Sequence, residues 1–425
     1  MKSFSAPRKG PFNLSTKAAF LVVTLVWVAV GVLGALPFYL SGVLPSFPDA
    51  VFESVSGFST TGLTVIADVE AAGAPLLFWR ALSHWLGGLG IVVITLAFLP
   101  FAGEAASRLF AAESPGPETD RISGRIANDA KALALIYVIL SAAQAILLRL
   151  CGMGWFDAVC HALATVSTGG FSTKNAGIAA FHSPAAEWVI IIFMLLGGFS
   201  FTVLRRIARG KLREALGNSE ARAYFIIIIV GTGIAALALG SVRGLREALF
   251  QVASTLSTTG FGTVNLAAWP AAAQGVVFIL LLVGGCSSST AGGVKVIRHL
   301  ILWKQTGSEM RRLLAPRGVF AIMIDGKAAK NTLVYGAAGF VFLYLAVAFL
   351  SLGVLAAAGL GIFQALNLSL CCLGNVGLGL GAADYGRAAA ALPAWAKWYL
   401  SALMIAGRLE LWTVFALFSN EWRRS

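Results

Sequence analysis

Three segments of this chain place small hydroxylated residues before a glycine, and a fourth has asparagine and valine there. Aligned on that glycine, they read STTGL at residues 59–63, STGGF at 167–171, STTGF at 257–261 and GNVGL at 374–378. Glycine has no side chain and an unrestricted φ, so its backbone can come close to an axis. Rings of backbone carbonyls can replace the hydration shell of an ion. The chemistry predicted by these residues is therefore coordination of a dehydrated cation by four backbone segments.

The predicted ion-binding residues are the four glycines and the two residues before each of them. Hydroxyl groups precede the glycine in three segments and can stabilise the backbone there through side-chain to backbone hydrogen bonds. The set is Thr60, Thr61, Gly62, Thr168, Gly169, Gly170, Thr258, Thr259, Gly260, Asn375, Val376 and Gly377. The transported ion would be the only metal that the chain holds.

A half-helix is expected before each segment and must position it. Thirteen residues upstream of each glycine, an acid or amide is followed by alanine: Asp49-Ala50, Asp157-Ala158, Glu247-Ala248 and Gln364-Ala365. This spacing leaves room for about three helical turns. The carboxyl end of a helix carries the negative end of its dipole. Four such half-helices around one axis would favour a cation where their carboxyl ends converge.

The composition indicates an integral membrane protein. Of the 425 residues, 58% are hydrophobic and 12% are charged. A helix needs about 20 apolar residues to cross a bilayer. Eight such spans are expected, at residues 18–40, 76–99, 132–150, 188–204, 223–239, 275–302, 332–355 and 395–418. The second span of each pair is opened by a proline, which suits a first helical turn: Pro75, Pro184, Pro270 and Pro393.

The predicted fold class is an all-α integral membrane protein. Four helix–pore loop–helix repeats, with eight spanning helices and four re-entrant half-helices, would surround a pseudo-fourfold pore. The expected repeats are residues 18–101, 131–210, 221–303 and 330–420, and residues 102–130 and 304–329 are expected to be cytoplasmic linkers.

The distribution of charge predicts the topology. If the spans alternate, most of the 32 Lys and Arg residues lie on the side that holds both termini. The positive-inside rule then places both termini in the cytoplasm, with the half-helices entering from outside. The first span is read as an uncleaved helix, because its apolar run is longer than that of a signal peptide. The net charge of +13 reflects this asymmetry and not a nucleic-acid partner.

A glycine- and hydroxyl-rich stretch interrupts the sixth span. Residues 284–293 read GGCSSSTAGG, and each glycine costs a helix roughly 1 kcal/mol relative to alanine. Irregular backbone at membrane depth must be buried in protein or line a cavity. We therefore predict a broken helix beside the ion path. The glycine pairs 87–88 and 197–198 at the same register are read instead as sites of close helix packing.

Arg408 occupies the register of Gly88, Gly198 and Gly285 in the last span. A charge inside a span is costly and needs partners, and the expected partners are carbonyls and hydroxyls of the 284–293 stretch. We predict a gate in which Arg408 holds this stretch across the pore; the alternative is a static fastener between repeats. The predicted gate residues are Gly284, Gly285, Ser287, Ser288, Ser289, Thr290, Gly292, Gly293, Lys295 and Arg408.

Nothing in the sequence indicates a bound cofactor. The five cysteines lie in or beside apolar runs without metal-like spacing, and there is no Gly-rich nucleotide-binding loop with Lys-Ser/Thr. An intramembrane hydrolase that uses Ser287, Ser289 or Cys286 as nucleophile is a remote alternative, because nucleophilic catalysis needs a base in reach. The four histidines do not cluster with that stretch in the sequence.

These motifs resemble the membrane subunit of the Trk/Ktr family of potassium uptake systems. The resemblance covers essentially the whole chain and is most specific at residues 284–295 (GGCSSSTAGGVK) and 407–410 (GRLE). It implies potassium uptake across a bacterial cytoplasmic membrane through a filter with one glycine per repeat: Gly62, Gly170, Gly260 and Gly377. It also implies a homodimer and a cytoplasmic ring of nucleotide-binding regulatory subunits similar to TrkA or KtrA.

The resemblance leaves the subfamily and the coupling ion open. The chain starts at its first repeat, as in the eight-span Ktr layout, although its motifs read as TrkH-like. Leu378 stands where many members have proline, and Ser288 where many have glycine. The sequence therefore does not predict whether transport is coupled to sodium, to protons or to neither. It also does not predict which nucleotide the regulatory subunit senses. Transport of sodium nearly as well as potassium remains an alternative, because one glycine per repeat implies few coordinating layers.

Overall fold

The computed structural model describes residues 16–90, 126–318, 320–329, 331–378 and 389–418. Within these ranges the chain is helical, apart from a two-stranded antiparallel hairpin of β1 (Met323–Ile324) and β2 (Lys327–Ala328). The expected end of the second span at 91–99 and most of the 102–130 linker lie outside the described residues.

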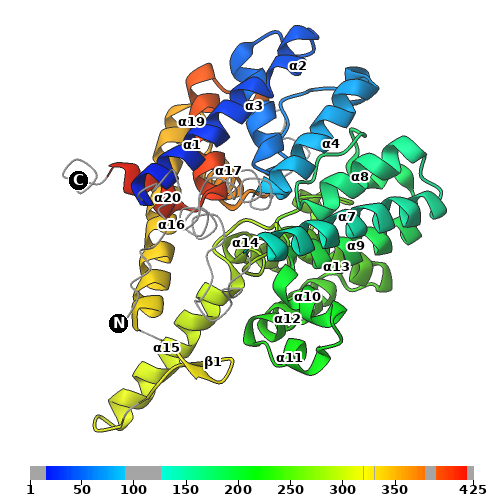
Figure 1. Ribbon diagram of the computed structural model, residues 1–425. Coiled ribbons are helices and arrows are strands. Elements are labelled where there is room, and N and C mark those ends of the chain that lie inside the picture. Colours follow the sequence, from blue (N-terminus) through cyan, green and yellow to red (C-terminus); the bar gives the residue numbers. More distant parts are fainter. Residues whose placement is uncertain (1–15, 91–125, 319, 330, 379–388, 419–425) are drawn as a thin grey trace, which may run out of the picture.

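The same order of elements recurs four times along the chain (Figure 1). The first helices are α1 (Thr16–Leu33), α7 (Ile126–Leu150), α12 (Ser219–Leu239) and α16 (Asn331–Ala357). The half-helices are α3 (Phe47–Phe58), α8 (Trp155–Val166), α13 (Val242–Leu256) and α17 (Ile362–Gly374). The second helices are α4 (Ala74–Gly88), α9 (Pro184–Gly198), α14 (Ala271–Val283) and α19 (Ala394–Arg408).

Burial separates the two kinds of helix. About a third or less of each long first helix is buried, between 28% and 33%, so most of its surface can face lipid. The half-helices lie inside: every residue of α3 from Ala50 to Phe58 is buried, as is the second half of α17. With 12 to 15 residues each, the half-helices are too short to cross a bilayer of about 30 Å. The four predicted half-helices are confirmed.

The repeats pack on one another in a closed cycle. Each second helix contacts the half-helix of the following repeat: α4 packs on α8, α9 on α13, α14 on α17 and α19 on α3. The last contact joins the end of the chain to its beginning, so the half-helices surround one centre.

The second helices break, and two of the breaks were not predicted. After α9 the chain bends by 104° at residues 199–200 into α10 (Phe201–Ala208), and after α19 it bends by 112° into α20 (Leu411–Phe415). The continuous spans expected at 188–204 and 395–418 are therefore wrong. The predicted break in the sixth span is confirmed, since twelve residues separate the end of α14 at Val283 from the start of α15 (Val296–Leu314).

The reason for the first unpredicted break is a tertiary contact. The Gly198 carbonyl accepts the backbone N–H of Cys286 (2.9 Å), and the Phe201 N–H donates to the Ser288 carbonyl (2.9 Å), so the 284–295 loop replaces the bonds of a continuing helix. In the described residues, four helices are long and apolar enough to cross a membrane, or six if each bent pair counts as one span. The count of eight spans remains a prediction.

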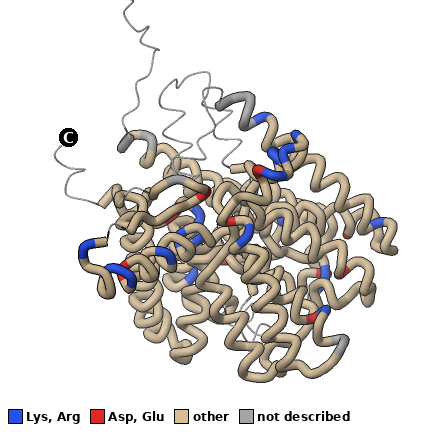
Figure 2. Tube along the Cα trace, turned by 90° about the horizontal axis from the view of Figure 1, so that it is seen from below, with Lys and Arg blue, Asp and Glu red and all other residues tan. Residues whose placement is uncertain are grey.

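The remaining elements complete the two ends of the molecule. The short helix α2 (Leu36–Leu40) nearly continues α1, and η1 (Glu70–Ala72), η3 (Gly177–Phe181) and η4 (Leu266–Ala268) follow the glycine segments. At the opposite end lie α10, α11 (Leu212–Leu216), α15 and the hairpin, and η5 (Ala416–Phe418) ends the described chain. Figure 2 shows many more basic than acidic residues when the molecule is seen from below.

Candidate functional site: an ion path and its intramembrane loop

The half-helices end in the same backbone turn. One residue at the end of each half-helix has a left-handed φ of 52° to 57°: Thr60, Thr168, Thr258 and Asn375. The next residue donates its N–H to a carbonyl five positions earlier, at 2.8 to 2.9 Å, in all four repeats. This is a Schellman motif, in which glycine usually takes the left-handed position. A threonine or asparagine here keeps a polar side chain at the end of each half-helix.

The glycine segments (60–62, 168–170, 258–260 and 375–377) lie against one another in a ring. A Cβ atom on Gly62 would lie 2.1 Å from the Gly169 carbonyl oxygen, and one on Gly170 would lie 1.9 Å from that of Thr259. A Cβ on Gly260 would meet the Gly377 nitrogen at 2.6 Å.

The contact that closes the ring comes from the fourth repeat. A Cβ on Gly377 would lie 2.7 Å from the Thr61 carbonyl oxygen. The structure thus brings all twelve predicted ion-binding residues together around one centre. Gly62, Gly170 and Gly260 also have a positive φ of 81° to 85°, whereas Gly377 does not. Glycine is required at all four positions because the neighbouring backbone leaves no room for a side chain.

Loop 284–295 lies directly against the ends of these segments. The Thr290 hydroxyl lies 3.1 Å from the carbonyl oxygens of Val166 and Gly197, and the Gly292 N–H donates to the Thr258 hydroxyl at 2.8 Å. The Thr168 hydroxyl approaches that of Thr290 at 3.3 Å. The loop is therefore fastened to the inner ends of the second and third segments.

Arg408 joins this loop to the first repeat. Its guanidinium donates to the Thr290 carbonyl at 2.6 Å and to the Gly87 carbonyl at 2.7 Å. The predicted contact between Arg408 and a loop carbonyl is confirmed; the partner in the first repeat was not predicted. Because both fork nitrogens are used, the side chain holds one orientation between the loop and α4.

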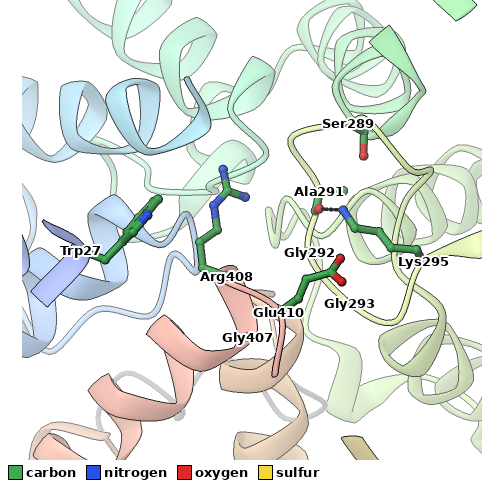
Figure 3. A pocket seen from close by; sticks show the side chains of 9 residues that line it. All are labelled: Trp27, Ser289, Ala291, Gly292, Gly293, Lys295, Gly407, Arg408 and Glu410. Atoms are coloured by element: carbon green, nitrogen blue, oxygen red, sulfur yellow. Dashed lines mark hydrogen bonds between the residues drawn. The ribbon is translucent and has the colours of Figure 1, made fainter. Parts of the chain in front are cut away.

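A cavity of about 30 Å³ lies beside Arg408. Figure 3 shows Arg408 reaching between Trp27 and the loop, with Lys295 on the far side and Glu410 below. Lys295 donates to the Ala291 carbonyl. The residues that line the cavity are Trp27, Ser289, Ala291, Gly292, Gly293, Lys295, Gly407, Arg408 and Glu410. Two cations and one carboxylate thus meet below the ring.

The comparisons with known proteins agree with this architecture. A family model described as TrkH, cation transport protein, matches residues 4–225 and 225–423. The chain belongs to the TrkH family. Among its relatives, the Trk system potassium uptake protein TrkH of Halomonas elongata is 38% identical over 426 residues, covering 97% of this chain and 87% of that protein. TrkH of Escherichia coli K12 is 36% identical over 428 residues, covering 98% and 88%.

A solved structure shares the fold as well. The crystal structure of the potassium transporter TrkH from Vibrio parahaemolyticus has a TM-score of 0.85 and 33% identity, covering 98% of this chain and 87% of that one. This member of the TrkH family is therefore a multi-pass membrane transport protein and not an enzyme. The Ser287 hydroxyl donates to Glu220 and the Ser289 hydroxyl to the Cys286 carbonyl.

The sequence analysis did not identify one carboxylate that binds loop 284–295. Glu220, 4% exposed at the start of α12, accepts the backbone N–H of Ser287 at 2.6 Å and its hydroxyl at 2.5 Å. The available signal was an acid directly before an apolar span.

A second missed group lies where the last second helix breaks. Glu410 pairs with Arg298 of α15, and Arg298 lies 3.8 Å from the centre of the Phe340 ring. Glu410 also has a left-handed φ of 58°, at the bend between α19 and α20. The ion pair therefore joins α15 to this bend.

The outer ends of the first two repeats are tied together. The Asn175 amide donates to Asp68 at 2.7 Å and accepts the Val69 N–H at 2.8 Å. The bond from Asn175 holds the pKa of Asp68 below its usual value of 3.8. Within the described residues no group of His, Cys, Asp or Glu is placed to hold a metal ion.

Proposed function

We propose that this chain takes up potassium through a gated pore whose selectivity filter is the ring of four glycine segments. The observation that carries the proposal is the closed contact of the four segments, each against the backbone of the next. The relatives named above are Trk system potassium uptake proteins, which supports potassium as the ion.

The proposed filter works through backbone carbonyls. The four half-helices end at the ring, so their negative dipole ends favour a cation there. Carbonyls of the residues at and before Gly62, Gly170, Gly260 and Gly377 replace water around the ion. The absence of side chains at the glycines keeps the four backbones close enough to coordinate one ion together.

The proposed gate is loop 284–295, held across the ion path below the ring. Its contacts with Thr168, Thr258 and Arg408 come from the second, third and fourth repeats. In this position the loop obstructs the path sterically, and the Arg408 guanidinium places positive charge near the axis. Opening requires the loop to leave these partners.

A cytoplasmic hairpin connects to the same loop. Asp325, at the tip of the hairpin, accepts the Ser219 N–H at 2.6 Å and the Asn218 amide at 3.0 Å. Glu220 directly follows Ser219 in the chain, and its carboxylate accepts the Ser287 N–H. Since α15 leads directly out of the loop and carries Lys304, whose amine donates to the Met323 carbonyl at 2.7 Å, a force on the hairpin or α15 reaches the loop from both sides.

We propose a nucleotide-binding cytoplasmic regulatory subunit, TrkA- or KtrA-like, as the source of that force, acting on a homodimer of this chain. The candidate docking surface is basic and consists of residues 205–213 and 304–330. We further propose that the protein resides in the cytoplasmic membrane of a bacterium, with both termini in the cytoplasm.

Complementation tests the proposed function. Expression in a bacterial strain that lacks potassium uptake should restore growth on low potassium. Lack of rescue, with the protein detected in the membrane, would contradict potassium uptake. Rubidium and sodium fluxes through the purified protein in liposomes then separate a selective pore from one that admits sodium nearly as well.

A further inference from the structure

Three polar side chains of the first repeat are buried behind the ring without taking part in it. Glu53 is 0% exposed, Arg80 2% and His84 0%. Glu53 lies on the half-helix α3, and the other two lie one turn apart on α4. Removing a charge from water costs several kcal/mol unless geometry and hydrogen bonds compensate for it. The bonds that these groups make therefore indicate their purpose.

Glu53 holds the outer end of its own filter segment. Its carboxylate accepts the Thr64 hydroxyl at 2.9 Å and the Val65 N–H at 2.9 Å, two and three residues after Gly62. It also accepts Arg80 Nε at 2.8 Å. The carboxylate thus links the first segment to the guanidinium.

Arg80 carries the link into the second repeat. Its Nη1 donates to the Ser172 carbonyl at 3.0 Å, two residues after Gly170. The guanidinium also lies over the Phe171 ring, 4.0 Å from its centre. The ion pair between Glu53 and Arg80 therefore connects the outer ends of two neighbouring filter segments.

His84 supports the same segment from behind. Its Nδ1 lies 2.7 Å from the Gly57 carbonyl, which can only accept, and its Nε2 lies 3.2 Å from the Phe171 N–H, which can only donate. These partners require a neutral imidazole with the proton on Nδ1. A Cβ on Gly169 would lie 2.3 Å from the His84 imidazole. The imidazole therefore limits how far the backbone of residues 168–170 can move away from the axis.

The other three repeats have apolar residues at the two second-helix positions, whereas the positions equivalent to Glu53 hold His161, Gln251 and Leu368. In the register of Gly88, Gly198, Gly285 and Arg408, the residues equivalent to Arg80 are Ile190, Val277 and Leu400, and those equivalent to His84 are Met194, Leu281 and Met404. All six are buried. Apolar side chains can therefore fill these two positions, and in the described second helices a guanidinium and an imidazole occupy them in the first repeat alone.

We infer that Glu53, Arg80 and His84 are positioning residues for ion selection, which set the spacing between the filter segments of repeats 1 and 2. The inference rests on the proposed function, since it needs a selective pore. It assigns to this seam of the ring a hydrogen-bonded support that contacts the backbone after Gly62 and after Gly170. In this role they act through the backbone of residues 62–65 and 169–172.

The test replaces the polar cluster by residues that the chain uses elsewhere. Glu53→Leu with Arg80→Leu copies the fourth repeat, where Leu368 and Leu400 stand, and leaves no unpaired charge. Rubidium and sodium fluxes are measured in liposomes. We expect transport to persist while the preference for rubidium over sodium falls about tenfold, equivalent to ~1.4 kcal/mol. An unchanged preference would overturn the inference.

The matched control removes a part-buried ion pair away from the ring. Lys397 pairs with Asp49 at the start of α3 and joins the fourth repeat to the first. Asp49→Asn with Lys397→Met should leave the ion preference unchanged. A fall as large as that of the test variant would show that any lost ion pair loosens the filter and would refute a special role for the cluster.

Two single variants decide the matter if the double variant does not fold. His84→Gln keeps a donor and an acceptor and should retain the preference, whereas His84→Met should lower it severalfold. Equal preferences in the two variants contradict the inference. The native protein is measured before any variant. If it transports rubidium and sodium equally well, the result refutes the proposed selective pore and not the role of the cluster.

Discussion

Glu220 and Ser287 join the start of the third repeat to loop 284–295 through two hydrogen bonds on one carboxylate. Arg408 holds the same loop from the opposite side, at Thr290. The loop is thus fastened between an anion and a cation that come from different repeats. If it moves during transport, these two attachments must yield, and their strengths set how often it does so.

The first prediction concerns the filter. Gly260→Ser should lower the preference for potassium over sodium by about tenfold or more, because a Cβ there meets the Gly377 nitrogen at 2.6 Å and the φ of 81° is strained for serine. Competition of sodium with rubidium uptake in liposomes measures this. Gly233→Ser is the control, since a Cβ there has nothing within 4 Å. If the mutant and the native protein have the same apparent affinities for rubidium and for sodium, Gly260 is not part of the filter.

The second prediction concerns the gate. Deleting residues 287–291 should raise ion flux in the absence of a regulatory subunit. The ends of the loop are held without these residues, since Lys295 N–H donates to the Val283 carbonyl at 2.9 Å and Val296 N–H to that of Gly285 at 3.0 Å. Flux that is unchanged or lost in a folded deletion protein would favour Arg408 and the loop as a static fastener.

The third prediction concerns Glu220. Glu220→Gln removes the charge that both Ser287 donors share, and a hydrogen bond to a charged group contributes about 1.5–3 kcal/mol. Basal flux without the regulator should therefore rise about tenfold. The control is Glu214→Gln, an exposed acid on α11 that pairs with Lys211. A basal flux equal to that of the control would mean that Glu220 does not restrain the loop.

The fourth prediction concerns the cytoplasmic partner. Arg311 and Arg312, exposed in the last turn of α15, should dock a soluble regulator. Reversal of both charges to glutamate should abolish co-purification while membrane insertion is kept. Arg149→Glu, exposed at the other end of the molecule, should have no effect. Intact co-purification would leave contact with lipid headgroups as the role of these charges.

Much of the local structure followed from sequence spacing. The four half-helices could be predicted because an acid or amide near the helix start and a glycine at the end recur at one offset, and because helix ends depend on nearby residues. The broken helix at residues 284–295 followed from its glycine content. The contact of Arg408 with this loop followed from the cost of a charge in a span, which leaves few choices of partner.

Only the tertiary structure decided the other breaks and the buried polar pairs. The helix ends after Gly198 because a loop some 90 residues later takes up its carbonyl, and no local signal at 199–200 encodes that contact. Glu53 and Arg80 are 27 residues apart, and the sequence does not state that they meet or that Arg80 also reaches Ser172. Hydrogen bonds between distant residues depend on how the repeats pack around the axis, and that packing is a property of the folded chain as a whole.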